Sequence, residues 1–423
     1  EIYLRALDSD PVLREAEATY LASAEARPQA RSALLPSLTL ESGLDGSRSE
    51  TTGPFGIGPI DLGDPVEITT INSRGSSDSL NLRLSQPLLN FANLRNLRQA
   101  EKTVAQAETD LAAARQELLL RVADAYFNVL AAEDTLAAEI AARESLSQQL
   151  EQAQRRFDVG LIAITDVQEA RAGYDQSVAN VIAAERALAT SHEFLREIIG
   201  DEVTDLRSPG ENLPLVNPEP FNVDEWVAAA EEQNLALISS RIGADIAQDE
   251  IDKQRAARLP TVSLSGNLGT TSSDNFGRVQ DADSLRWALS FQMPVFTGGI
   301  NRSRIQQSVY RHRAAIETLE RVARQTERQT RDAYLGVISE ISRVDALRQA
   351  LESSQTALLA TQAGEEVGQR TVVDVVNAQN NVRRAETTYA QARYEYLLNV
   401  LRLKQASGSL TQDDLAEIDG WLE

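Results

Sequence analysis

Two stretches of this sequence read alike and indicate how the rest of the chain is organised. Residues 157–167 are Phe157-Asp-Val-Gly-Leu-Ile-Ala-Ile-Thr-Asp166-Val, and residues 365–375 are Glu365-Glu-Val-Gly-Gln-Arg-Thr-Val-Val-Asp374-Val. In each, a Val-Gly step is typical of a helix C-terminus, and a Thr or Asp beyond it can cap a second helix. Both features recur at one constant offset, so the chain contains two copies of one supersecondary unit.

Long helices are predicted on both sides of each of these turns. Residues 88–208 and 295–423 contain no proline and are rich in Ala, Leu, Gln, Arg and Glu, which favour helix. In the second copy Val375, Val382, Tyr389 and Tyr396 recur every seventh residue, as in a coiled-coil seam. We expect helices at about residues 10–34, 91–157 and 166–199 in the first copy, and 223–257, 298–364 and 374–406 in the second.

Four strands are predicted where proline, glycine, serine and threonine concentrate. Apolar and polar residues alternate over residues 37–48, 78–88, 260–271 and 284–295, as in the run Leu285, Trp287, Leu289, Phe291. Such strands suit half of a soluble sandwich, but the sequence offers no second sheet to cover the apolar face. They equally suit an outer-membrane barrel, whose apolar face meets lipid. Four strands cannot close a barrel, so several copies would have to share one.

Composition excludes several classes of function. Acidic residues outnumber basic ones by 63 to 41, giving a net charge of -22, and no basic patch is evident, so nucleic acid is not an expected partner. The absence of cysteine excludes disulfides and thiolate catalysis. Only His192 and His312 could supply imidazole. We therefore expect no enzyme activity, no metal site and no cofactor. With 63 acidic residues, carboxylate pairs like those of a glycosidase are expected to occur by chance.

In order and spacing, the duplicated strand pair, long helix, turn and short helix resemble the TolC family of outer-membrane channel-tunnel proteins. The resemblance covers essentially the whole chain. Its motifs are 34–36 (Leu-Leu-Pro), 125–130 (Ala-Tyr-Phe-Asn-Val-Leu), 156–161 (Arg-Phe-Asp-Val-Gly-Leu), 163–168 (Ala-Ile-Thr-Asp-Val-Gln), 294–299 (Pro-Val-Phe-Thr-Gly-Gly) and 367–375 (Val-Gly-Gln-Arg-Thr-Val-Val-Asp-Val).

This resemblance implies a mainly α fold with a membrane β portion. Three copies would form an α-helical barrel continuous with a shared twelve-stranded antiparallel β-barrel, four strands from each chain. Residues 1–208 would be the first structural repeat and 223–406 the second. The connector 209–222 and the C-terminal segment 407–423 would form an equatorial domain.

The resemblance also implies a function and partners. The homotrimer would be a passive exit duct in the outer membrane of a Gram-negative bacterium, reaching into the periplasm. A periplasmic membrane-fusion adaptor and an inner-membrane pump of the RND or ABC type would supply its substrates, in multidrug efflux, type I protein secretion or both. Outer-membrane lipid would surround the sheet, with Leu285, Trp287, Leu289 and Phe291 facing it.

Residues of the duct's tip can be assigned by matching positions to the family. Asp374 matches an aspartate that narrows the tunnel, and Asn377 stands where the family has a second, so we expect one acidic ring. The tip gating network comprises Thr165, Asp166, Glu365 and Arg370. There we expect an Arg370–Asp166 pair with Glu365, which replaces a tyrosine, as a second acceptor. Adaptor contacts are expected at the two turns, at Val159, Gly160, Leu161, Val367, Gly368 and Gln369.

Two other interpretations remain at this point. A soluble periplasmic coiled-coil scaffold would explain the helices and the acidity, but not four alternating strands at matched positions of a duplicate. For Asp166 and Asp374, the simpler interpretation is that each compensates the dipole at a helix N-terminus.

Overall fold

The structure, a computed structural model, describes residues 1–54, 68–203, 206–210, 213–275 and 278–422, in two compact units. The helical unit comprises Glu1–Ala22, Ala105–Ile242 and Ile316–Glu423, and the sheet unit comprises Ser23–Val104 and Gly243–Ala315. Several helices run through both units. Within the described residues, no helix is long and apolar enough to cross a membrane.

The elements follow the duplicated order that the sequence predicts. The first copy contains α1 (Ile2–Ser9), α2 (Pro11–Ala24), α3 (Ala26–Ser32), β1 (Ser37–Pro54), β2 (Ile68–Leu89), α4 (Phe91–Asp158) and α5 (Ile164–Ile199). The second contains α6 (Val223–Gln233), α7 (Leu235–Ala256), β3 (Thr261–Asn275), β4 (Arg278–Gln292), α8 (Ile300–Glu366), α9 (Val372–Ser407) and α10 (Gln412–Asp419).

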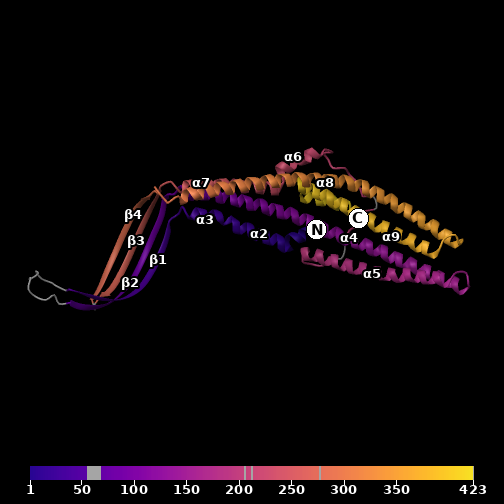
Figure 1. Ribbon diagram of the computed structural model, residues 1–423, viewed down its shortest axis with the longest axis horizontal. Helices are drawn as coiled ribbons and strands as arrows, with labels where there is room; N and C mark the ends of the chain where they lie inside the picture. Colours follow the sequence, from indigo (N-terminus) through magenta and orange to yellow (C-terminus); the bar gives the residue numbers. More distant parts are fainter. Residues whose placement is uncertain (55–67, 204–205, 211–212, 276–277, 423) are drawn as a thin grey trace, which may run out of the picture. The chain divides into compact units, whose positions relative to one another are not determined.

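The sheet unit contains one antiparallel sheet in the order β1-β2-β3-β4, whose strands lie side by side in Figure 1. Its register aligns the apolar positions: Leu40 lies opposite Leu82, Leu82 opposite Leu268, and Leu268 opposite Leu285. One face of the sheet is therefore an apolar band, because alternate residues share a face. Among the described residues β1 and β4 are the outer strands, and each leaves one backbone edge unpaired.

The strands extend further than the predicted ranges 37–48, 78–88 and 260–271. The β1–β2 ladder continues to the pair Pro54/Ile68, and the β3–β4 ladder to Asn275/Arg278. These extensions are rich in Ser, Thr, Gly and Asp, so their sequence lacks the apolar alternation that marks a half-buried strand. Backbone pairing continues the ladders there, with a few cross-strand side-chain contacts such as that between the Thr52 and Thr70 hydroxyls (3.2 Å). At the other end, β4 stops at Gln292, before the predicted residue 295.

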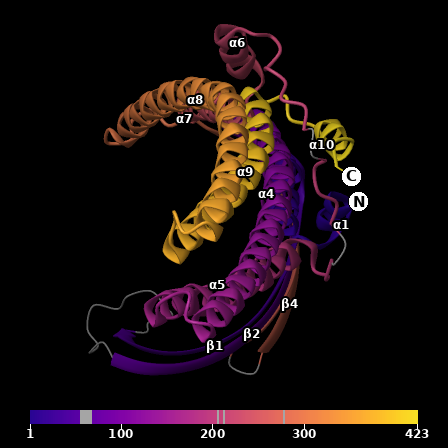
Figure 2. The same ribbon diagram turned by 90° about the vertical axis from the view of Figure 1, so that its right-hand side faces the viewer.

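The core of the helical unit lies between α4, α8 and α9. Its fully buried members include Leu130 of α4, Val337 of α8 and Leu397 of α9. In Figure 2, α8 and α9 run alongside each other with α4 next to α9. Tyr396 is also fully buried, and its hydroxyl accepts a hydrogen bond from Val216 N (2.9 Å), which fixes the connector against α9.

Two helices predicted as continuous are each interrupted, one at Glu25 without a side-chain cap and one at the capping residue Asn234. The predicted helix 10–34 begins at Asp10, whose Oδ2 accepts from Leu13 N (2.7 Å), and divides into α2 and α3 near Glu25. The predicted helix 223–257 divides at Asn234, whose Oδ1 accepts from Leu237 N (3.1 Å). Asp and Asn are favoured N-caps, but neither is preceded by a glycine or proline stop that would reveal the break.

Asn234 also positions the end of α9. Its Nδ2 donates to Ala406 O (3.0 Å), and Gly408, with φ of 81°, ends α9 beside the Gln233 backbone. A Cβ at Gly408 would lie 2.3 Å from Gln233 O. Glycine is thus required there both for its backbone conformation and for the close approach.

Candidate functional site

The first turn joins α4 to α5 through Val159, Gly160 and Leu161. Gly160 has φ of 78°, and Leu161 N donates to Arg156 O (2.9 Å), which closes the end of α4. Val159 is 70 % exposed and Leu161 72 % exposed. The turn therefore presents two apolar side chains to solvent on a conformation that its glycine and capping bonds hold.

The second turn joins α8 to α9 with the same backbone geometry. Gly368 has φ of 74°, and Gln369 N donates to Gly364 O (2.8 Å). Val367 is 69 % exposed, while Gln369 replaces the leucine of the first turn. Each turn thus pairs a glycine in the left-handed region with an exposed valine.

The four residues expected in the tip network do not all meet within one chain. The Glu365 side chain is buried and pairs with Arg156 of α4. Arg370 lies over Gly364, because a Cβ on that glycine would be 2.8 Å from Arg370 Cγ. Asp166 Oδ2 accepts from Ala163 N (3.2 Å), and Thr165 is exposed. Among the described ion pairs of the single chain, none joins Arg370 to Asp166.

Asp374 lies in the first turn of α9 and forms a capping box. Its Oδ2 accepts from Thr371 N (2.9 Å) and Thr371 Oγ1 (3.0 Å), while Asp374 N donates to Thr371 Oγ1 (3.2 Å). These bonds to Thr371, and then the charge of Arg370, lower the pKa of Asp374. Asn377, one helical turn further along the same face, is exposed.

A cluster of small apolar residues fixes the two turns relative to each other. Ala153 of α4, Val167 and Ala170 of α5, and Val372 of α9 are buried together. Gly173 of α5 faces Val376, where a Cβ would lie 3.1 Å from Val376 Cγ1. The absence of a side chain at Gly173 therefore allows α5 to approach α9 closely.

The sequence interpretation did not anticipate a series of polar contacts that connects α4 to α9. Arg383 pairs with the buried Glu139, Gln379 donates to Ser145, and Tyr394 donates to Asp134 (2.6 Å). Burial, and then the hydrogen bond to Asp134, raises the pKa of Tyr394, so its hydroxyl remains a donor. Glu139 and Arg383 have long charged side chains, which usually indicate a solvated helix face, and no sequence signal marks them as partners.

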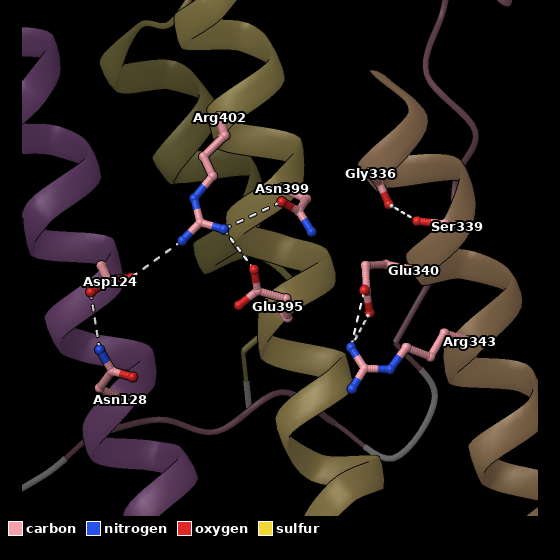
Figure 3. A network of polar contacts seen from close by, with 9 residues as sticks. All are labelled: Asp124, Asn128, Gly336, Ser339, Glu340, Arg343, Glu395, Asn399 and Arg402. Atoms are coloured by element: carbon pink, nitrogen blue, oxygen red, sulfur yellow. Dashed lines mark hydrogen bonds and ion pairs between the residues drawn. The ribbon is translucent and has the colours of Figure 1, made fainter. Parts of the chain in front are cut away.

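Figure 3 shows the far end of this series. Arg402 of α9 lies between Asp124 of α4, 3.7 Å away, and Glu395 of its own helix, 2.6 Å away. On α8, Arg343 pairs with Glu340 (3.1 Å). Apolar and polar contacts alternate along this part of the helical unit, so it is not one continuous apolar seam.

The sheet carries the other predicted surface. The side chains of β4 that share the apolar face are all largely exposed in the single chain: Leu285 76 %, Trp287 74 %, Leu289 63 % and Phe291 68 %. Trp287 lies opposite Gly266 in the register of β3 with β4. A contiguous exposed apolar band of this kind indicates a membrane or protein contact.

An exposed apolar band on a four-stranded sheet, together with coiled helix pairs and capped hairpin turns, defines the class of outer-membrane channel. The family model described as outer membrane efflux protein matches residues 2–201 and 226–409. The chain belongs to that family. It is therefore an outer-membrane channel protein of a Gram-negative bacterium and not an enzyme.

Relatives and solved structures agree with this assignment. The chain is 34 % identical to the outer membrane protein TolC of Vibrio cholerae, over 100 % of this chain and 93 % of that protein. It is 28 % identical to the alkaline protease secretion protein AprF of Pseudomonas aeruginosa, over 98 % and 85 %. The CmeC outer membrane channel of Campylobacter jejuni superposes with a TM-score of 0.77 at 18 % identity, covering 99 % of this chain and 88 % of that one.

The open-state MtrE outer membrane channel of Neisseria gonorrhoeae superposes with a TM-score of 0.74 at 21 % identity, covering 97 % of this chain and 89 % of that one. The predicted fold class is confirmed: it is that of the trimeric channels that combine a helical barrel with a β-barrel. The comparisons support the predicted function in efflux and secretion, and they do not support the alternative of a soluble coiled-coil scaffold.

Proposed function

We propose that three copies of this chain assemble into an exit duct that receives substrates from an inner-membrane pump through a periplasmic adaptor. The duct is passive, and the pump is of the RND or ABC type. We infer two classes of cargo from the names of relatives. The name of the outer membrane efflux protein BepC indicates substrates of efflux, and the names of the protease secretion proteins indicate secreted proteins. The pump selects the cargo.

The observation that carries the adaptor proposal is the exposure of apolar side chains at both turns. Val159, Leu161 and Val367 are each about seven-tenths exposed and lie on turns held by capping hydrogen bonds. A protein partner gains affinity by covering such side chains, and a rigid turn loses little entropy when it binds. Gly160, Gly368 and Gln369 complete the two contact surfaces.

The absence of cysteine allows a clean test of this contact. Single-cysteine variants at Leu161 and Gln369 would carry a photoactivatable cross-linker in cells that contain the adaptor. We expect covalent adaptor complexes from both positions. Ile182, which is 62 % exposed on α5 and distant in sequence from both turns, is the matched control. Cross-linking from Ile182 alone would place the docking surface elsewhere.

Closure of the β-barrel supports the proposed trimer. Unpaired strand edges are not tolerated in lipid, and β1 and β4 each present one. Three copies joined edge to edge would pair them in a twelve-stranded barrel, with Leu285, Trp287, Leu289 and Phe291 facing lipid. Light scattering in detergent should give a protein mass near three times 46.3 kDa. A detergent-free monomer would exclude the shared barrel.

At the tip, we assign the constriction to Asp374, with Asn377 as an uncharged neighbour. Three Asp374 carboxylates in one ring would favour cations. Because Arg370 and Asp166 do not pair within one chain, their proposed lock acts between neighbouring copies. Glu365 is already paired with Arg156, so it contributes to the same network by holding α8 against α4.

The connector 209–222 and the segment 407–423 form the proposed equatorial domain. Contacts in their described parts support this assignment. Arg393 of α9 donates to Pro209 O (2.9 Å), Lys404 pairs with Asp414 (2.6 Å), and Pro209 forms an isolated β-bridge with Leu422. Both segments are therefore held against the same helix.

A further inference from the structure

One row of the sheet's polar face is basic in a chain whose net charge is -22. The register places Thr39 opposite Arg83, Arg83 opposite Asn267, and Asn267 opposite Arg286. Two of the four residues in this row are therefore arginines, one on β2 and one on β4. The strand between them contributes only a neutral amide, so their Cα atoms are about 10 Å apart at a strand spacing of ~4.8 Å.

These two arginines differ in how far their charge is compensated. Arg83 lies 3.7 Å from Glu41 of the next row, and both side chains are more than half exposed. Exposed pairs of this kind are weak, so Arg83 remains available to a ligand. Among the ion pairs of the described residues, none involves Arg286, whose side chain is also exposed. On β3 and β4, the rows on either side of Arg286 contribute only uncharged residues, which are Ser265, Gly269, Ser284 and Ala288.

The apolar band identifies which face this row occupies. Leu285 and Trp287 flank Arg286 in sequence, so the arginine lies on the opposite face of the sheet. In a membrane barrel that is the lumen face, where charged residues set ion selectivity. Three copies would contribute six guanidinium groups to one ring and three carboxylates of Glu41 to the adjacent row.

We propose that Arg83 and Arg286 form a basic ring in the barrel lumen that binds polyanions carrying phosphate or carboxylate groups. Guanidinium groups bind such oxyanions in a bidentate manner, and rings of arginine are typical of anion-conducting pores. The barrel would then favour anions, while the proposed Asp374 ring favours cations. Anionic cargo that has passed the acidic tip would thus meet a favourable site in the sheet.

Side-specific block of conductance tests this proposal. The purified trimer would be inserted into a phosphatidylcholine bilayer free of lipopolysaccharide, at 0.1 M KCl, where the Debye length is about 10 Å. Inorganic tripolyphosphate added on the barrel side should reduce conductance at lower concentration than on the tip side. Arg286→Gln should raise the blocking concentration several-fold, Arg83→Gln by less, and the double variant should abolish the difference between sides.

Three further variants make the result specific. Arg286→Lys keeps the charge and should retain most of the block. Glu41→Gln removes the carboxylate beside Arg83 and should strengthen it. Arg278→Gln is the matched control, because Arg278 lies on the same strand and face, eight residues or about 27 Å from Arg286. It should leave the block unchanged.

Two results would overturn the basic ring. One is equal block of the wild type and the double variant. The other is loss of the trimer in Arg286→Gln, which would mean that Arg286 pairs with Glu41 of a neighbouring copy instead of binding a ligand in the lumen. The inference rests on the proposed duct, and the two can fail separately. If the wild-type protein forms no channels, the proposed duct is wrong. If it forms channels whose block by tripolyphosphate does not change when both arginines are replaced, only the proposed basic ring is wrong.

Discussion

The two hairpin turns share a backbone geometry and differ in chemistry. Position by position, Phe157 corresponds to Glu365, Leu161 to Gln369, Ile162 to Arg370 and Ala163 to Thr371. The first turn is apolar, and Phe157 and Ile162 pack on the small-residue cluster among α4, α5 and α9. The second is polar, with a buried carboxylate, a guanidinium over Gly364 and a capping threonine.

Only the glycine and the aspartate are common to both turns at the positions that set geometry. Gly160 and Gly368 end the preceding helix, and Asp166 and Asp374 accept capping bonds at the start of the next. The duplicated unit has therefore kept its turn, including the exposed valine before each glycine, while most of its other side chains diverged. We expect adaptor binding to depend on both turns, whereas gating and ion selectivity should depend mainly on the second turn.

The largest effect is expected where the two turns are joined, at the pair of Arg156 with Glu365. Arg156→Ala leaves a buried carboxylate without its partner, which should destabilise the local fold by about 3 kcal/mol. Hydrogen–deuterium exchange of residues 150–165 should accelerate accordingly. Adding Glu365→Gln should restore most of the protection, because the uncompensated charge is removed. Equal exchange in the single and double variants would show that the pair is not the cause.

Ion selectivity should distinguish the two aspartates. Asp374→Asn should lower the potassium-to-chloride permeability ratio several-fold, because it removes the charge while keeping a capping side chain. Asp166→Asn, the matched change in the first turn, should alter the ratio little. Reversal potentials across a KCl gradient provide the measurement. A similar fall in both variants would mean that the turns contribute equally to the constriction.

Leak through the resting channel should depend on the guanidinium of the second turn. Arg370→Glu would replace the proposed attraction to Asp166 of a neighbouring copy with repulsion, and it should therefore raise leak conductance. Single exposed pairs contribute roughly 0–1 kcal/mol each, so the effect comes from three acting together. Arg370→Lys should leak less than Arg370→Glu. Wild-type leak in Arg370→Glu would exclude the proposed lock.

The smallest effect concerns pH and the Thr371 cap. Hydrogen bonds with Thr371 lower the pKa of Asp374 because they stabilise its charged form. This stabilisation is fully present at pH values above the ordinary carboxyl pKa. It is lost as the pH falls through the lowered pKa, where Asp374 becomes protonated. Thr371→Ala removes one donor and should therefore shift the loss of cation preference to higher pH. Ala163→Thr, in the first turn, should not shift it. An unchanged midpoint in Thr371→Ala would show that repulsion within the ring dominates.

The sequence predicted those features that depend on local pattern. Heptad spacing and the absence of proline placed the ends of α4, α5, α8 and α9 within two residues of those observed. Alternation indicated the strands, but only as far as their apolar faces continue. The polar ladder beyond Leu44 depends on backbone pairing with a distant segment, which no local pattern reveals.

The site was predicted less completely, because several of its contacts join distant segments. The family resemblance led us to expect Glu365 beside Arg370, whereas in the structure it pairs with Arg156, more than 200 residues away. The buried pair of Glu139 and Arg383 likewise joins two distant helices, α4 and α9. In the sequence, charged residues of this kind indicate a solvent-exposed helix face. The capping role of Asp374 was foreseeable, because a Thr-x-x-Asp spacing precedes an apolar run.

The two unpaired edges of the sheet also have a genetic consequence. If each strand edge must be completed by another copy, every working ring contains three products of the gene. A variant that still pairs its edges but blocks the pore would enter mixed rings and inactivate them. When such a variant and the wild type are made in equal amounts, only about one ring in eight would be wholly wild type. Such alleles should therefore be dominant, whereas those that prevent edge pairing should be recessive.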